Sequence, residues 1–367
     1  MILWNHSLRA DAFDGYHEKD GFRYTAGEHT CIIFSYIGTK KDIVIPDEID
    51  GADEIYVQLK RLVGKNKQVR SIHLSKNVVD VDGYYLDDAD WLDKEDEYYR
   101  GVDVNTHPIE TFQYENYQNW EKITVDEDNP NFTSVDGVLY RKNMKSICMI
   151  PSRISGTFVV PDSVEYVCGF TENSRITHFI IGKNVCGFSC GHLSCHKYLK
   201  KLTVAKGNKS FAMKKGVLYS KDMTEIYGSR NLKGIYRMPS TVKSVYPYAF
   251  ASNRGLKKVI LSDKLDFLST GIFAGCRKLA HIKFGKKDCG IGEGAFYKTA
   301  IKKIKLPKQI AIVYLRGQSF RTIITSNPRL KVGDFDYEDE FEQMYRITNP
   351  LAKKLAKEFK IKIVQKK

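Results

Sequence analysis

The sequence lacks the long apolar runs of a membrane protein. It contains no stretch of about 18 apolar residues. Its first residues, MILWNHSLRADAFDGYHEKDG, have no basic region followed by the apolar core of a signal peptide. As written, the chain is expected neither to cross a membrane nor to be secreted, which predicts a cytoplasmic protein. A signal peptide removed from the natural chain would instead predict secretion or display at the cell surface.

The motifs of the common enzyme classes are missing too. No nucleophile elbow, P-loop, H-E-x-x-H motif or dinucleotide-binding fingerprint occurs. Most histidines stand alone in the sequence, and a lone histidine is more often a surface or packed residue than a catalytic base. We therefore expect no catalytic residues, no cofactor and no enzymatic activity.

Charge is present in excess but unevenly distributed. The net charge is +14. Residues 80–128 contain sixteen Asp and Glu against three basic residues, whereas residues 254–322 contain sixteen Lys and Arg against four acidic ones. The basic half would attract acidic partners, and the two regions could attract each other.

An internal repeat determines the expected fold. Residues 254–276, 277–299 and 300–322 share the frame L-x-x-I-x-L, then an apolar pair, then a small residue and Phe. Phe250, Phe273 and Phe296 recur every 23 residues. The L-x-x-I-x-L stretch alternates with period two and predicts a short strand. Such units bury their apolar face only by stacking strand beside strand in a parallel sheet, so the sequence predicts a β-rich repeat solenoid.

A longer duplication overlies the short repeat. ITVDEDNPNFTSVDGVLY at 123–140 matches LTVAKGNKSFAMKKGVLY at 202–219. The Asp136-Gly137 and Lys215-Gly216 steps each lie between β-prone runs, which predicts a β-hairpin insertion at both places.

These residues resemble the BspA-like class of bacterial leucine-rich repeats, whose units run roughly as C-x-x-L-x-x-I-x-I-P-x-S-V-x-x-I-G-x-x-A-F. The resemblance is carried by VVPDSVEYV, YRMPSTVKSVYPYAF, GIFAGCRKLAHIKF and GEGAFYKTAIKKIKLP, and it covers about residues 21–322. It implies a right-handed leucine-rich-repeat coil with a concave parallel β-sheet and an adhesion or protein-binding role, often at a bacterial surface. It implies no catalytic residues.

The expected domain organisation is an N-terminal cap at 1–41, the solenoid at 42–322 and a C-terminal cap at 323–367. Asn349 and Pro350 predict the start of a short capping helix over 349–359, in which Leu351, Leu355 and Phe359 share one face. An extended IKIV follows. Together these elements would cover the last coil, whose strand edge is otherwise open.

The non-core positions of the L-x-x-I-x-L strands form the first candidate binding site. They should form ladders of side chains on the concave face, rich in lysine, that bind a protein or an acidic glycan or phosphate polymer. The residues are Lys200, Lys201, Thr203, Lys257, Lys258, Ile260, Ala280, His281, Lys283, Lys302, Lys303 and Lys305. The alternative is that these lysines only keep an open sheet soluble. Without a recognised motif, nucleic acid is not the predicted partner.

The insertion at 84–120 combines acidic residues with aromatic ones, among them Trp91, Tyr98, Tyr99 and Trp120. It could form a secondary contact with a partner, or its rings could pack on the flank of the solenoid. The main hypothesis is thus a non-enzymatic interaction module. The alternative is a structural or self-associating protein that joins its acidic and basic regions.

The eight cysteines are expected to be mostly reduced and buried. Cys168 and Cys186 fall at comparable places in consecutive repeats, and Cys195 falls where Cys276 lies later, as buried cysteines would. The alternative is zinc bound by a cluster with no standard finger spacing, which comprises Cys186, Cys190, His192, Cys195 and His196. No metal site is predicted.

Overall fold

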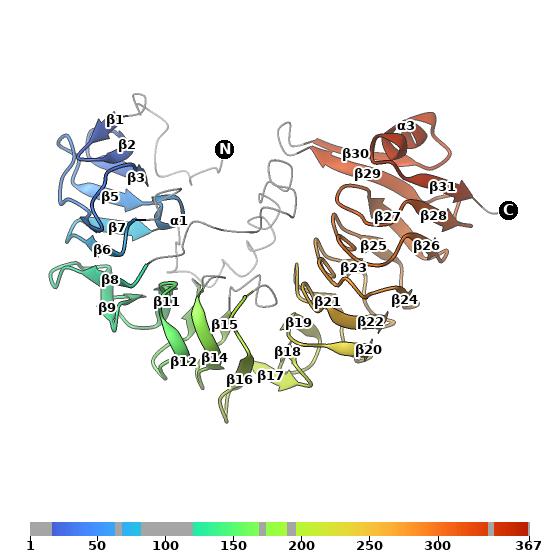
Figure 1. The fold of residues 1–367 in the computed structure, drawn as a ribbon, viewed down its shortest axis with the longest axis horizontal. Helices are drawn as coiled ribbons and strands as arrows, with labels where there is room; N and C mark the ends of the chain where they lie inside the picture. The colour runs from blue at the N-terminus through green and yellow to red at the C-terminus, as the bar shows by residue number, and fades with distance from the viewer. Residues whose placement is uncertain are drawn as a thin grey trace. The chain divides into compact units, whose positions relative to one another are not determined.

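The computed structural model describes residues 17–62, 68–81, 120–168, 174–188, 196–336 and 341–365. The chain forms two compact units, which contain the described residues up to Ala205 (unit 1) and from Lys206 onward (unit 2). Both consist almost entirely of short strands, as Figure 1 shows. Successive coils pair in parallel, so the predicted β-rich repeat solenoid is confirmed.

In unit 1, the first strand of each coil joins one of two three-stranded parallel sheets. These contain β4 (Asp42–Val44), β6 (Ser71–Leu74) and β8 (Lys122–Val125), and then β12 (Ser155–Val159), β14 (Arg175–Ile181) and β16 (Lys201–Val204). A second strand in each coil builds two five-stranded sheets. One is β1 (His17–Lys19), β2 (Phe22–Ala26), β3 (Thr30–Tyr36), β5 (Glu54–Val57) and β7 (Val78–Val81); the other is β15 (Gly187–Phe188), β13 (Tyr166–Val167), β11 (Ser146–Met149), β10 (Val138–Arg141) and β9 (Phe132–Val135). The short helix α1 (Leu59–Leu62) follows β5.

Unit 2 repeats this arrangement. Its first strands form the sheets β20 (Lys233–Arg237), β22 (Gly255–Ile260), β24 (His281–Lys283) and β26 (Lys303–Leu306), β28 (Thr322–Thr325), β31 (Lys362–Gln365). Its other strands form β17 (Phe211–Lys214), β18 (Val217–Ser220), β19 (Glu225–Ser229), β21 (Ser244–Val245) and β23 (Phe267–Leu268), β25 (Cys289–Ile291), β27 (Ile310–Tyr314), β29 (Lys331–Asp336), β30 (Phe341–Arg346).

The period-two pattern decides which side chains enter the core. Val259 on β22 is fully buried and pairs with Ile282 on β24, while the neighbouring Ile260 pairs with Lys283 on the outer side. No strand pairing joins β24 to β26. This break coincides with a change of spacing, because Ile282 and Ile304 are 22 residues apart whereas Val259 and Ile282 are 23 apart. The side-chain ladder expected across the first strands of unit 2 is therefore divided between two sheets of three strands each.

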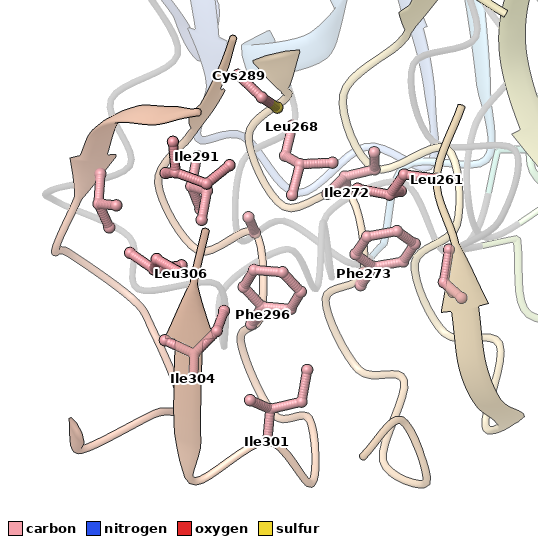
Figure 2. Close-up of a cluster of buried hydrophobic side chains, with 14 of the residues drawn as sticks. Leu261, Leu268, Ile272, Phe273, Cys289, Ile291, Phe296, Ile301, Ile304 and Leu306 are labelled. Atoms are coloured by element: carbon pink, nitrogen blue, oxygen red, sulfur yellow. The ribbon is translucent and has the colours of Figure 1, made fainter. Parts of the chain in front are cut away.

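A stack of phenylalanines forms the core of unit 2. The ring centroids of Phe250 and Phe273 lie 5.5 Å apart, those of Phe273 and Phe296 5.8 Å apart, and Phe320 extends the stack at 6.2 Å. Figure 2 shows Phe273 and Phe296 beside the apolar side chains of both strand series, with Ile304 and Leu306 on β26 and Ile291 on β25. The 23-residue period of Phe is thus the period of one coil.

Both predicted hairpins are present. β9 and β10 pair antiparallel around Asp136-Gly137, and β17 and β18 pair around Lys215-Gly216. All four turn residues have positive φ, between 48° and 79°. Two consecutive left-handed residues match the twist of the flanking strands, which explains a tight turn with glycine second.

The C-terminal helix is also present, as α3 (Pro350–Glu358), with the side chain of Asn349 accepting from the backbone N–H of Leu351. Its buried face differs from the expected one. Ala352, Leu355 and Ala356 are buried, while Leu351 is 47% exposed, so placing Leu351 on the packed face was wrong. The small alanine side chains let the backbone of α3 approach the strands that it contacts, β29, β30 and β31. The IKIV segment becomes β31, which pairs in parallel with β28 and adds a coil to the sheet.

Candidate interaction surface

The candidate surface in unit 2 is the outward side of β20, β22, β24, β26, β28 and β31, which we call the lysine face. These six strands contain eight Lys or Arg residues and no Asp or Glu. The six corresponding first strands of unit 1 contain three basic residues and one acidic residue, Asp42. The excess of positive charge on the first strands is therefore much larger in unit 2 than in unit 1.

Strand register arranges these side chains in rows across the coils. In the first sheet, Ile235, Lys258 and His281 form one row, and Arg237, Ile260 and Lys283 form the next. In the second sheet, Lys303, Thr322 and Lys362 share a row, and Lys305, Ile324 and Val364 share another. Neighbouring strands lie about 4.8 Å apart, so the two basic residues of the row Arg237, Ile260 and Lys283, like those of the row Lys303, Thr322 and Lys362, lie on strands about 10 Å apart.

The lysines of this face carry uncompensated charge. Among the described residues, no ion pair involves Lys257, Lys258, Lys283, Lys303, Lys305 or Lys362 of the face, nor Lys302 directly before β26. Lysines just beyond the strands behave differently, since Lys286 and Lys287 lie 3.4 and 3.0 Å from Asp263 and Asp266. Without nearby acids, the face keeps a positive potential that extends over roughly 8–10 Å at physiological salt.

Apolar side chains interrupt the basic ones. Ile235 is 59% exposed, and Ile260, Ile324 and Val364 are half-buried on the same side. Solvated lysines alone would explain solubility, but alternating Ile and Lys also offer apolar contact area to a partner. Sequence reasoning missed Ile235, Arg237 and Lys362. The K-G-I-Y-R and I-K-I-V segments already showed the alternation that could have identified them.

Lys200, Lys201 and Thr203 belong to unit 1, whereas the other candidate residues belong to unit 2. Lys201 and Thr203 lie on β16 beside β14, where His178 Nε2 is 2.9 Å from Thr203 Oγ1. Desolvation lowers the pKa of His178, and the positive charge of Lys201 lowers it further. Neutral His178 therefore adds no positive charge at pH 7, and this part of unit 1 is less basic than the lysine face.

The secondary contact residues Trp91, Tyr98 and Tyr99 lie outside the described residues. Trp120, at the end of the same insertion, is 2% exposed and packs in the core of unit 1. It is therefore not available as an exposed anchor for a partner.

The cysteines divide between buried and exposed positions. Cys168 is buried, but Cys186 is exposed, so its expected burial was wrong. The register explains this, because Tyr166 pairs with Gly187, which places Cys186 level with half-buried Glu165 rather than with Cys168. Cys190, His192 and Cys195 of the candidate zinc cluster lie outside the described residues. The described residues contain no group of three His, Cys, Asp or Glu that could hold a metal ion.

Within the described part of the chain, no helix has the length and apolar character needed to span a bilayer.

Comparison with known proteins supports the repeat. Residues 226–322 match the model of the BspA type leucine rich repeat region, in six copies. A search of curated proteins found no match to this chain.

Solved bacterial leucine-rich-repeat structures are similar only at a distance. A leucine rich cell surface protein from Faecalibacterium prausnitzii is 14% identical, covers 87% of this chain and 97% of its own, and has a TM-score of 0.42. The pneumococcal vaccine antigen PcpA is 15% identical, with 96% and 99% covered and a TM-score of 0.40. A leucine-rich repeat protein from Eubacterium ventriosum is 16% identical, with 85% and 72% covered and a TM-score of 0.34.

The strand register, the 23-residue Phe stack and the family match lead to the same assignment. Residues 226–322 are a leucine-rich-repeat region of the BspA type, within a chain that folds as a β-solenoid.

Proposed function

We propose that this chain is a non-enzymatic interaction or adhesion module that binds an acidic macromolecule on its lysine face. The observation that carries the proposal is the composition of that face, eight basic residues and no acidic ones on six stacked strands. A repeated cationic surface suits a partner that is itself extended and anionic.

An acidic polypeptide fits better than a simple polyanion. Ile235 and Ile260 lie between Lys258, Lys283 and Arg237, and a glycan or phosphate polymer has no apolar side chains to use them. A peptide with carboxylates and apolar side chains would use both kinds of contact. Acidic glycan or phosphate polymers remain the alternative partner.

The test uses poly-L-glutamate as an acidic polypeptide and heparin as a sulfated glycan. The variant K258E/K283E/K303E reverses three charges on the face, and K243E/K264E/K353E reverses three exposed lysines outside the six strands. The face variant should lose poly-L-glutamate binding by tenfold or more, about 1.4 kcal/mol, while the control keeps most of it. Equal losses in both variants would mean that binding follows net charge alone.

The salt dependence provides a second readout. Binding to the wild-type face should weaken steeply between low and physiological salt, because solvent-exposed charges are screened. Because the face also offers apolar contacts, acidic peptides that contain Trp or Leu should bind more tightly than poly-L-glutamate does. Heparin binding tighter than peptide binding on the same face would favour the glycan alternative.

A further inference from the structure

We propose that the occupant of the lysine face is the acidic aromatic segment, residues 84–119, of a second copy of this chain. This inference rests on the proposed function, since it names the acidic polypeptide that the face receives. It makes the protein a self-assembling solenoid.

The first argument is charge. Residues 84–119 contain ten Asp or Glu and two basic residues, Lys94 and Arg100. The lysine face has the opposite composition, and the described ion pairs leave its lysines unneutralised. Joining the two would bring net charges of opposite sign together, whereas a face left open carries the repulsion among its own lysines.

The second argument is the pattern of apolar residues. Within DDADWLDKEDE, residues 87–97, Trp91 and Leu92 lie among seven carboxylates. On the face, Ile235 and Ile260 lie among Lys258, Lys283 and Arg237. The sequence of the segment and the rows of the face thus both interleave charged and apolar residues, and contacts of both kinds could form along one extended chain.

The third argument is length. Eleven extended residues span about 36 Å at roughly 3.3 Å each, while three strands about 4.8 Å apart span about 10 Å. Residues 87–97 are therefore long enough to cross either three-stranded sheet of the lysine face.

The fourth argument is where the segment is attached. It leaves unit 1 at Val81, the end of β7, and returns at Trp120, whose carbonyl accepts from the N–H of Arg153. The described residues at both ends of the segment, Val81 and Trp120, belong to unit 1, and the face belongs to unit 2. Contacts between copies that use two different surfaces are heterologous, so each added copy leaves one segment and one face available. The expected product is a concentration-dependent series of oligomers.

The experiment is a charge exchange followed by sedimentation velocity on the full chain at low and high salt. Wild type should form larger species as concentration rises and return to monomers at high salt. The face variant K258E/K283E/K303E and the segment variant D88K/D90K/D93K should each be monomeric alone. Mixed, they should associate again, because each then presents a surface complementary to the other. The control K243E/K264E/K353E should behave as wild type.

Two outcomes would overturn the inference. One is association that persists unchanged in either reversed variant. The other is a wild-type chain that stays monomeric at every concentration. That outcome includes the case in which the segment docks on its own chain, so that salt changes the shape of the monomer but not its mass. Poly-L-glutamate binding in the same buffers separates this failure from failure of the proposed function. If the peptide binds wild type but not the face variant, the face still binds acidic polypeptide and only its assignment to a second copy is lost.

Discussion

Arg141 Nη2 donates a hydrogen bond to Asp80 Oδ1 over 2.8 Å and ties hairpin strand β10 to β7 in unit 1. The Asp80 side chain is 6% exposed, and the Arg141 guanidinium lies 4.7 Å from the centroid of the Phe132 ring. A buried carboxylate without its partner is costly, because it has lost water without gaining a counter-charge.

Replacing Arg141 with Ala should therefore lower the free energy of unfolding by on the order of 3 kcal/mol. The double variant D80N/R141M should lose clearly less, since it removes the stranded charge. Urea denaturation of R141A and of the double variant measures the difference. Equal losses in R141A and the double variant would show that packing, not charge, dominates this contact.

The phenylalanine stack predicts a large effect at one position and a small one nearby. Phe273 is fully buried between Phe250 and Phe296, so Phe273→Ala should cost about 3–5 kcal/mol through the cavity it leaves. Phe267 is 38% exposed on β23, and Phe267→Ala should cost much less. Urea midpoints of the two variants provide the comparison, and similar shifts would contradict a core built on the stack.

Two glycines with the same φ make it possible to measure the cost of a left-handed backbone separately from the cost of a steric clash with an added Cβ. Gly137 and Gly156 both have φ of +79°, but a Cβ on Gly137 would lie 2.7 Å from Lys122 Cβ, whereas Gly156 has nothing within 4 Å. Gly156→Ala should cost about 1–2 kcal/mol from the left-handed backbone alone. Gly137→Ala should cost more, because β8 must move away. Thermal unfolding of both variants measures this, and a larger loss at Gly156 would be the contradictory result.

Buried thiols should make stability fall at high pH. Burial raises the pKa of Cys276 to about 12 from an ordinary value near 9, and its Sγ donates to the carbonyl oxygen of Phe250 at 3.0 Å. Between pH 9 and about 12, the unfolded chain releases this proton while the folded chain keeps it, so deprotonation favours unfolding as pH rises. The variant C276A should show a flatter decline over this range in urea denaturation at several pH values.

The same burial predicts selective alkylation. In native protein at pH 8, iodoacetamide should modify exposed Cys186 and leave Cys276 unmodified, because only an accessible thiolate reacts. Peptide mass spectrometry locates the label. Labelling of Cys276 as fast as Cys186 would mean that the coil opens readily in the folded state.

The sequence was sufficient for the features that depend on local periodicity. Alternation in K-K-V-I-L and the recurrence of Phe predicted the strands and the stack, and Asp136-Gly137 predicted a hairpin. It was not sufficient for features that depend on register. Cys186 is exposed because β13 and β15 pair with Tyr166 opposite Gly187, and neither residue signals that alignment by itself.

Long-range contacts were equally hidden. Asp80 and Arg141 are 61 residues apart, and nothing near either residue marks it as half of a pair. Leu351 looked like a core residue by helical spacing, but the flanking alanines set how closely α3 approaches and left Leu351 outside. The lysine face could be predicted only in part. The repeat frame predicted lysines such as Lys258 and Lys303, whereas Lys362 belongs to the face only because β31 pairs with β28.

The missing pairing between β24 and β26 has a mechanical consequence for unit 2. On the opposite side of the same coils, β23, β25, β27, β29 and β30 continue without interruption. A load that spreads these two coils would therefore meet a row of backbone hydrogen bonds on one side. On the other side it would meet mainly side-chain packing, with one backbone hydrogen bond from the N–H of Ala300 to the carbonyl of Leu279. Unit 2 should open most easily at this point, with the continuous sheet acting as the hinge and the rings of Phe296 and Phe320 moving apart.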